Sequence, residues 1–114
     1  MKRAVSTDDF KLNSHACWYG ALDGFADAAL PACDRALALA PDDPREIGNV
    51  RDSRGLARAV NGDVKGAVDD FQFFVKSRDS GDDKKRQQRE GWLSELQAGR
   101  NPFDRAMLEA LRRE

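Results

Sequence analysis

Apolar residues follow an α-helical spacing in two segments that lie 38 positions apart, as positions 29 and 67 show. One segment carries the stripe Ala29, Leu30, Cys33, Ala36 and Leu37, and the other carries Ala67, Val68, Phe71, Phe74 and Val75. In both, the offsets i, i+1, i+4, i+7 and i+8 place the five side chains on one face of an α-helix, whereas a strand requires alternation. The pattern therefore predicts two helices of the same design.

A turn-forming pair precedes each of these helices at the same offset, Asp23-Gly24 in the first copy and Asn61-Gly62 in the second. Glycine accepts a positive φ, and Asp or Asn can hydrogen-bond to the backbone just beyond it. Small or apolar residues before the turns also align, namely Cys17, Ala21 and Leu22 with Gly55, Ala59 and Val60. The chain is therefore predicted to contain one unit twice, helix, tight turn, helix, over residues 11–43 and 44–79.

Prolines and capping residues set the expected helix bounds. The four predicted helices cover residues 12–22, 25–40, 44–60 and 63–76, with Asp43 as the N-cap of the third and Pro44 in its first turn. Pro31 falls in the second turn of its helix, where it removes a hydrogen bond. That helix is therefore expected either to start late, near Ala28, or to kink.

The C-terminal part predicts two more helices. One covers residues 84–98 and stops at Gly99; its first half is polar, so it is expected to project past the core or to cover a rim. Asp104 caps the last one, which carries the short stripe Met107, Leu108 and Leu111. We interpret residues 82–114 as a degenerate third unit that caps the array. The expected fold is all-α with about six helices, in a single domain of residues 11–114 after a flexible segment of residues 1–10.

The repeated unit resembles the tetratricopeptide repeat family, with another α-hairpin array as the alternative. That family has a small residue in the first helix, a glycine in the turn, then Ala, a large apolar residue, Ala and a closing Pro. The first copy matches with Cys17, Gly24, Ala29, Cys33, Ala36 and Pro41, and the second with Gly55, Gly62, Ala67 and Phe71. Phe74 and Asp79 depart from the pattern, and the period of 38 exceeds the family's 34.

The resemblance implies a concave groove that is lined by the first helix of each unit and holds an extended or helical peptide. The family's groove positions fall on Lys11, Ser14, Trp18, Asn49, Asp52 and Leu56, and Arg89 continues the row. This set lacks the Lys and Asn clamp by which some members hold a C-terminal carboxylate. Trp18 and Leu56 suggest an apolar anchor instead.

The charge and hydropathy of the chain limit the classes of partner that it is expected to bind. The 19 basic and 20 acidic residues give a formal net charge of -1, so no global field favours nucleic acid or an anionic membrane. The basic run of residues 84–89 is flanked by acids and holds no aromatic residue, which favours a solvated helix face over nucleic-acid contact. No export signal and no membrane-spanning run is visible, and we expect a soluble, cytoplasmic protein.

Candidate chemistry is sparse. The single histidine, His15, has no carboxylate or thiol at a fitted spacing, and Asp69-Asp70 is interpreted as part of a solvated face. Cys17 and Cys33 lie on facing helices of one hairpin and could approach each other, but we interpret them as core thiols in a reducing compartment. Two thiols and one histidine fall short of a structural zinc site. The sequence thus predicts no enzyme, no cofactor and no metal.

The leading functional hypothesis is a non-catalytic module that binds a peptide or protein segment in the concave groove. The alternative is a C-terminal structural unit of a larger repeat or multidomain protein, or a self-associating one, because two good repeats fall short of the three or so that stabilise a solenoid. A nucleic-acid accessory domain is the third and least favoured hypothesis.

Overall fold

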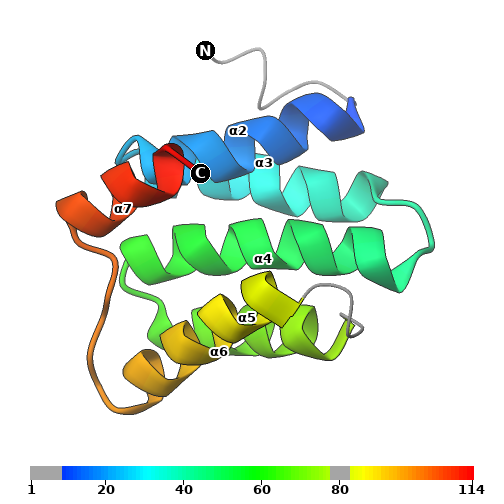
Figure 1. Ribbon diagram of the computed structural model, residues 1–114. Helices are drawn as coiled ribbons and strands as arrows, with labels where there is room; N and C mark the ends of the chain where they lie inside the picture. The colour runs from blue at the N-terminus through cyan, green and yellow to red at the C-terminus, as the bar shows by residue number, and fades with distance from the viewer. Residues whose placement is uncertain (1–8, 78–82) are drawn as a thin grey trace.

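The computed structural model describes residues 9–77 and 83–114, and within those residues it contains six α-helices and no strand (Figure 1). The helices are α2 (Phe10–Leu22), α3 (Ala26–Leu39), α4 (Pro44–Val60), α5 (Val64–Ser77), α6 (Asp83–Gln97) and α7 (Arg105–Arg112). The all-α class and the number of helices are confirmed. Residues 1–8 of the predicted flexible segment lie outside the described residues, and α2 already begins at Phe10.

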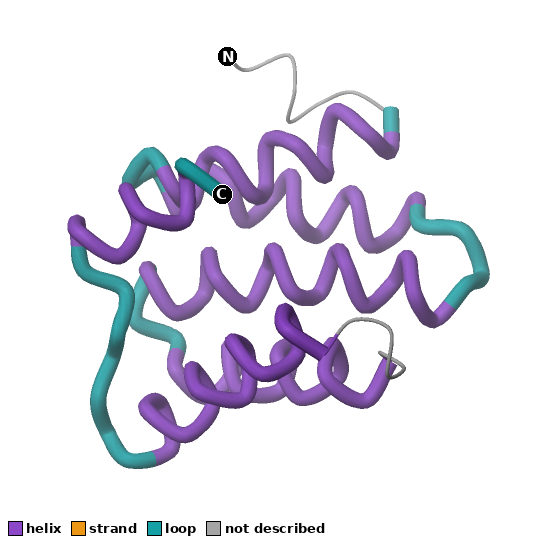
Figure 2. The backbone as a smooth tube through the Cα atoms, viewed as in Figure 1, coloured by secondary structure: helices purple, strands orange, loops and turns teal. Residues whose placement is uncertain are grey.

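The two predicted hairpins, α2–α3 and α4–α5, turn in the same way (Figure 2). Gly24 and Gly62 have φ of 87° and 91°, a region that glycine enters without steric cost. The Phe25 amide donates to the Gly20 carbonyl at 2.8 Å, and 38 residues later the Asp63 amide donates to the Arg58 carbonyl at 2.7 Å. The repetition inferred from the sequence therefore extends to the backbone hydrogen bonds of the turns.

Pro31 neither delays nor ends its helix, because α3 begins at Ala26 and continues through Pro31 to Leu39. The predicted late start near Ala28 is therefore wrong. A proline inside a helix leaves the carbonyl four residues earlier, here that of Asp27, without its donor. Both Pro31 and Asp27 are exposed, so water can solvate the backbone at this point.

Aspartates cap four of the described helices, and the one before α5 is Asp63, which accepts from the Gly66 amide at 3.0 Å. The carboxylates of Asp9, Asp43 and Asp104 accept hydrogen bonds from the amides of Leu12, Arg45 and Met107, at 3.0, 3.0 and 2.8 Å. Each satisfies an amide that has no partner within its own helix. The predicted caps Asp43 and Asp104 are confirmed.

Removal of the Asp104 cap is expected to destabilise the chain modestly. Asp104→Ala should lower the free energy of unfolding by about 1 kcal/mol, since the Met107 amide loses its acceptor. Urea denaturation followed by circular dichroism measures the change. Asp42→Ala, at an exposed aspartate outside any helix, is the control and should change stability by less than about 0.5 kcal/mol. Equal effects of the two substitutions would contradict the capping role.

The last two helices do not form the expected third hairpin. Among the described elements, α6 packs on α5 and α7 packs on α2, while α6 and α7 do not pack on each other (Figure 1). The connection is fixed where it crosses the molecule, because the Asn101 side chain donates to the Ala59 carbonyl at 2.9 Å. Phe103 then packs edge-on against Trp92, with ring centroids 4.9 Å apart. The interpretation of residues 82–114 as a third unit is therefore wrong, since these contacts direct α7 to the first hairpin.

One hydrophobic core joins all six helices. Its buried members come from both hairpins and from the C-terminal part, and include Cys17, Ala21, Cys33, Leu56, Phe71, Trp92, Leu96, Phe103, Leu108 and Leu111. The rings of Phe71, Trp92 and Phe103 contact one another, with centroids 4.9 to 6.1 Å apart. The C-terminal helices thus complete a core that the two hairpins alone would leave open to water.

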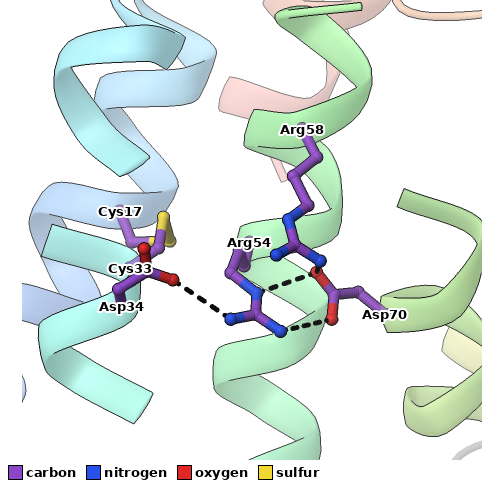
Figure 3. Close-up of a disulfide and its surroundings, with 6 residues drawn as sticks. All are labelled: Cys17, Cys33, Asp34, Arg54, Arg58 and Asp70. Carbon is purple, nitrogen blue, oxygen red and sulfur yellow. Dashed lines mark hydrogen bonds and ion pairs between the residues drawn. A yellow bond between two sulfur atoms is a disulfide. The ribbon is translucent and has the colours of Figure 1, made fainter. Parts of the chain in front are cut away.

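Cys17 and Cys33 form a disulfide between α2 and α3, so the prediction of free thiols is wrong (Figure 3). Their Cα atoms are 4.7 Å apart, within the range that a disulfide requires. The close approach depends on Gly20, because a Cβ placed there would lie only 2.8 Å from the Cβ of Ala29. A glycine at this contact lets the two helices come close enough for the sulfur atoms to bond.

Asp70 is buried and ion-paired, which overturns its interpretation as part of a solvated face; Asp69 beside it is exposed. Arg51, Arg54 and Arg58 from α4 all donate to its carboxylate, at distances of 2.9 to 3.1 Å. Figure 3 draws two of them, Arg54 and Arg58, beside Asp70. The hydrogen bond to Asp70 raises the pKa of Arg54 above its ordinary value, against the opposing effect of burial. Three arginines on one face of α4 therefore fasten α5 to it through a single carboxylate.

Candidate functional site

A cleft of about 310 Å³ opens between the N-terminal halves of α2 and α4. The α2 wall carries Phe10, Lys11, Ser14 and His15, and the α4 wall carries Glu46, Asn49, Val50 and Ser53. These are the first helices of the two hairpins, so the cleft lies on the surface that the resemblance assigned to ligand binding. The cleft is one open part of that surface.

The two walls are held by the caps and by the packing behind them. Asp9 and Asp43 fix the first turns of α2 and α4, at the end of each helix that borders the cleft. Behind α4, Gly55 lets α5 come close, because a Cβ there would lie 3.0 Å from the Phe71 ring. The disulfide joins α2 to α3. The cleft is therefore bordered by helices whose positions are set by the core.

The chemistry of the cleft is mixed. Lys11 and His15 place basic groups on one wall, and Glu46 places a carboxylate on the other. Ser14, Asn49 and Ser53 add neutral hydrogen-bonding groups, while Phe10 and Val50 supply apolar surface. The Ser14 hydroxyl oxygen is buried, and no group in residues 9–77 or 83–114 hydrogen-bonds to it.

The other half of the inner surface is closed by α6. Arg89 from α6 is only 2% exposed, and its Nε and Nη2 donate to the two carboxylate oxygens of Asp52, at 2.9 and 2.7 Å. This bidentate geometry is the strongest form of an arginine–carboxylate contact. The pair fastens α6 across α4 at the centre of the predicted groove.

Aromatic rings surround the Arg89 guanidinium. Its central carbon lies 4.4 Å from the ring centroid of Trp92, 5.3 Å from that of Phe74 and 5.8 Å from that of Trp18. The faces of aromatic rings attract a cation, and the attraction strengthens where water is excluded. One arginine thereby links α6 to α2, α4 and α5.

The seven predicted groove residues separate into two groups. Lys11, Ser14 and Asn49 line the open cleft. Asp52, Leu56 and Arg89 are buried, and Trp18 is half-buried against the core. The expectation that Trp18 and Leu56 form an accessible apolar anchor is therefore wrong, because the C-terminal helices cover this half of the surface. Within the polar first half of α6, Arg89 is buried instead of projecting past the core.

Five residues of the cleft were not predicted as groove residues: Phe10, His15, Glu46, Val50 and Ser53. Helical periodicity contains part of the missing signal, since His15 lies four residues after Lys11, and Ser53 lies four after Asn49. The groove positions taken from the family resemblance follow a single line along each helix. They leave out the adjacent positions that also line the cleft. His15 is exposed, and its ring lies beside that of Tyr19, with centroids 4.4 Å apart.

The described side chains include no group of three or more His, Cys, Asp or Glu residues that could hold a metal ion. No helix in the same part of the chain is both long enough and apolar enough to cross a bilayer. In the basic run of residues 84–89, Lys84, Lys85 and Gln87 are exposed, while Arg89 forms a buried ion pair with Asp52. The run is therefore a solvated face only in part.

A scan against protein-family models and searches of curated proteins and of solved structures found no match to this chain. The resemblance to tetratricopeptide repeats therefore stays a prediction from the sequence pattern.

Proposed function

We propose that the chain is a non-catalytic module that binds a short peptide segment in the cleft between α2 and α4. The observation that carries this proposal is the cleft itself, which is open on the inner helices and carries polar side chains on both walls. Its volume of about 310 Å³ is near the lower end of the range for ligand sites. It therefore fits a few side chains of a peptide rather than a long helix.

The polar groups of the cleft favour a peptide with both acidic and basic positions. Lys11 and His15 on one wall favour an acidic side chain, and Glu46 on the other favours a basic one. Asn49 and Ser53 can donate to and accept from a peptide backbone. Phe10 gives the bound segment an apolar contact.

A peptide selection tests the proposal. Peptides are selected by display on the folded full chain, and their affinities are compared with those for Asn49→Trp, which places a large ring in the cleft. We expect the ring to weaken binding by tenfold or more, about 1.4 kcal/mol. Lys65→Trp, at an exposed position of α5 away from the cleft, is the matched control. Peptides that bind both variants as tightly as the unmodified chain would refute the proposal.

A second candidate function is a structural unit that stacks on another helical segment. It is supported by three large apolar side chains of the first hairpin that stay exposed: Leu12, Tyr19 and Phe25 are 53%, 39% and 64% exposed. A further repeat of a solenoid would cover exposed apolar side chains of this kind. A location in the cytoplasm stays a prediction; the cysteines no longer support it, since a disulfide is more typical of oxidising compartments.

A further inference from the structure

Leu12, Ala16 and Tyr19 form the outer face of α2, because residues four and then three positions apart lie on one side of a helix. Leu12 is 53% exposed, Tyr19 is 39% exposed and Ala16 is half-buried. Among the described elements, α3, α4 and α7 pack on α2 and leave these side chains accessible to water. Helix α7 reaches the edge of the face, where the Arg112 guanidinium lies 5.9 Å from the Tyr19 ring centroid.

Each residue of the outer face has a counterpart in α4, 38 positions later in the chain. The counterparts are Val50, Arg54 and Ala57. Val50 is 3% exposed and Ala57 is 0% exposed, so the two counterparts of the large apolar residues are buried. The same positions of the repeat are therefore covered in the second copy and open to water in the first.

The preceding hairpin covers the counterpart face of α4. Among the described elements, α4 packs on both α2 and α3. Arg54, in the middle of the face, donates to Asp34 of α3 at 3.1 Å (Figure 3). Ala57 belongs to the same core cluster as Cys17 of α2. The outer face of α2 thus continues, one unit earlier, an interface by which the chain already holds a helical hairpin.

The hairpin that covers α4 indicates the chemistry that fits such a face. Most of the buried residues of α2 and α3 are Ala or Cys, so the hairpin packs through small side chains. Ala16 stands where α4 has Arg54, so a hairpin on α2 needs no carboxylate at the position of Asp34. A second intact copy does not offer this packing surface, because its own α4 covers it. A different helical hairpin is therefore the occupant that fits.

We propose that the outer face of α2 binds an α-helical hairpin of a partner polypeptide whose contact residues are small and apolar. Burial of Leu12 and Tyr19 would stabilise the complex, because it removes apolar surface from water. The inference rests on the second candidate function and adds to it the surface and the kind of partner. None of the three residues lines the cleft between α2 and α4, so the two surfaces can be tested separately.

A repeat added in front of the chain tests the proposal. A second copy of residues 6–43, inserted before residue 6 of the full chain, keeps the spacing of 38 and supplies a hairpin of the required design. The added repeat should raise the urea midpoint of unfolding, since neighbouring repeats stabilise one another. Leu12→Asp in the original copy should then lower the midpoint of the extended chain by about 1 M, because the carboxylate is buried there.

The unextended chain gives the matched comparison. Leu12→Asp should change its midpoint by less than about 0.3 M, since Leu12 is exposed. Lys65→Asp, at an exposed position of α5, should have equally little effect in both chains. If the added repeat stabilises the chain but Leu12→Asp has no effect, stacking uses another surface; the second candidate function then stands and this inference is wrong. If the added repeat leaves the midpoint unchanged, both are wrong.

A titration of the unmodified chain keeps the inference falsifiable if the extended chain does not fold. A synthetic hairpin of residues 9–43, closed by its disulfide, is added to the isotopically labelled full chain. Amide resonances around Leu12, Ala16 and Tyr19 should shift most, and Leu12→Asp should raise the dissociation constant about tenfold. Largest shifts around Asn49, or no shifts up to millimolar hairpin, would overturn the inference. So would a dimer of the chain itself that Leu12→Asp abolishes, because the occupant would then be a second copy.

Discussion

Replacing Arg89 with alanine is expected to lower the free energy of unfolding by about 3–5 kcal/mol, which is a large share of the stability of a domain of this size. The substitution leaves the buried carboxylate of Asp52 without its two hydrogen bonds. It also removes the cation that lies among the rings of Trp18, Phe74 and Trp92. Urea denaturation, followed by tryptophan fluorescence and circular dichroism, measures the loss.

Two further variants separate the buried charge from simple truncation of a side chain. Lys84→Ala, at an exposed position of the same helix, should change stability by less than about 0.5 kcal/mol. The double variant Arg89→Met, Asp52→Leu should recover most of the loss, since apolar residues of similar size often replace a buried ion pair without cost. If Arg89→Ala lowered the free energy of unfolding by less than about 1 kcal/mol, the conclusion that α6 closes half of the inner surface through Arg89 would be wrong.

Removal of the disulfide is expected to cost about 3 kcal/mol, because it joins residues only 16 positions apart and the entropic effect grows with the length of the loop. The double variant Cys17→Ala, Cys33→Ala should unfold at correspondingly lower urea concentration. A reductant should shift the unmodified chain in the same direction and leave the double variant unchanged. Two thiols that react in the unreduced, unfolded chain would show that the bond does not form.

The repeated part of the fold could be predicted because its signals are local. The Asp23-Gly24 and Asn61-Gly62 turns, the N-cap at Asp43 and the apolar stripes each depend on residues within a few positions of one another. The structure reproduces these elements within a few residues of the predicted bounds. Local chemistry also located the Asp104 cap and the end of α6 near Gly99.

The candidate site could be predicted only in part, because its limits depend on contacts between distant segments. Arg89 and Asp52 are 37 residues apart, and the groove positions taken from the family resemblance carry no sign that the two side chains pair. Asp70 appeared solvated for the same reason, since its three arginines lie on the preceding helix. Buried charges follow no periodicity of their own; only the position of their partners shows them to be buried.

The direction of α7 was also beyond the local signals. The sequence indicated a helix after Asp104 but not which surface its Leu108 and Leu111 would cover. That choice depends on Asn101, which bonds to the Ala59 carbonyl, and on Phe103, which packs beside Trp92. As a result α7 packs on α2 rather than on α6.

Chemical-shift mapping of the full chain with a display-selected peptide tests the central claim most directly, that the inner surface is open between α2 and α4 and closed beneath α6. Titration should move the amide resonances around Ser14, Asn49 and Ser53, while those around Leu56 and Arg89 stay in place. If the largest shifts fall instead on Leu56, Arg89 and Trp92, the peptide has displaced α6 and the open cleft is not the binding site.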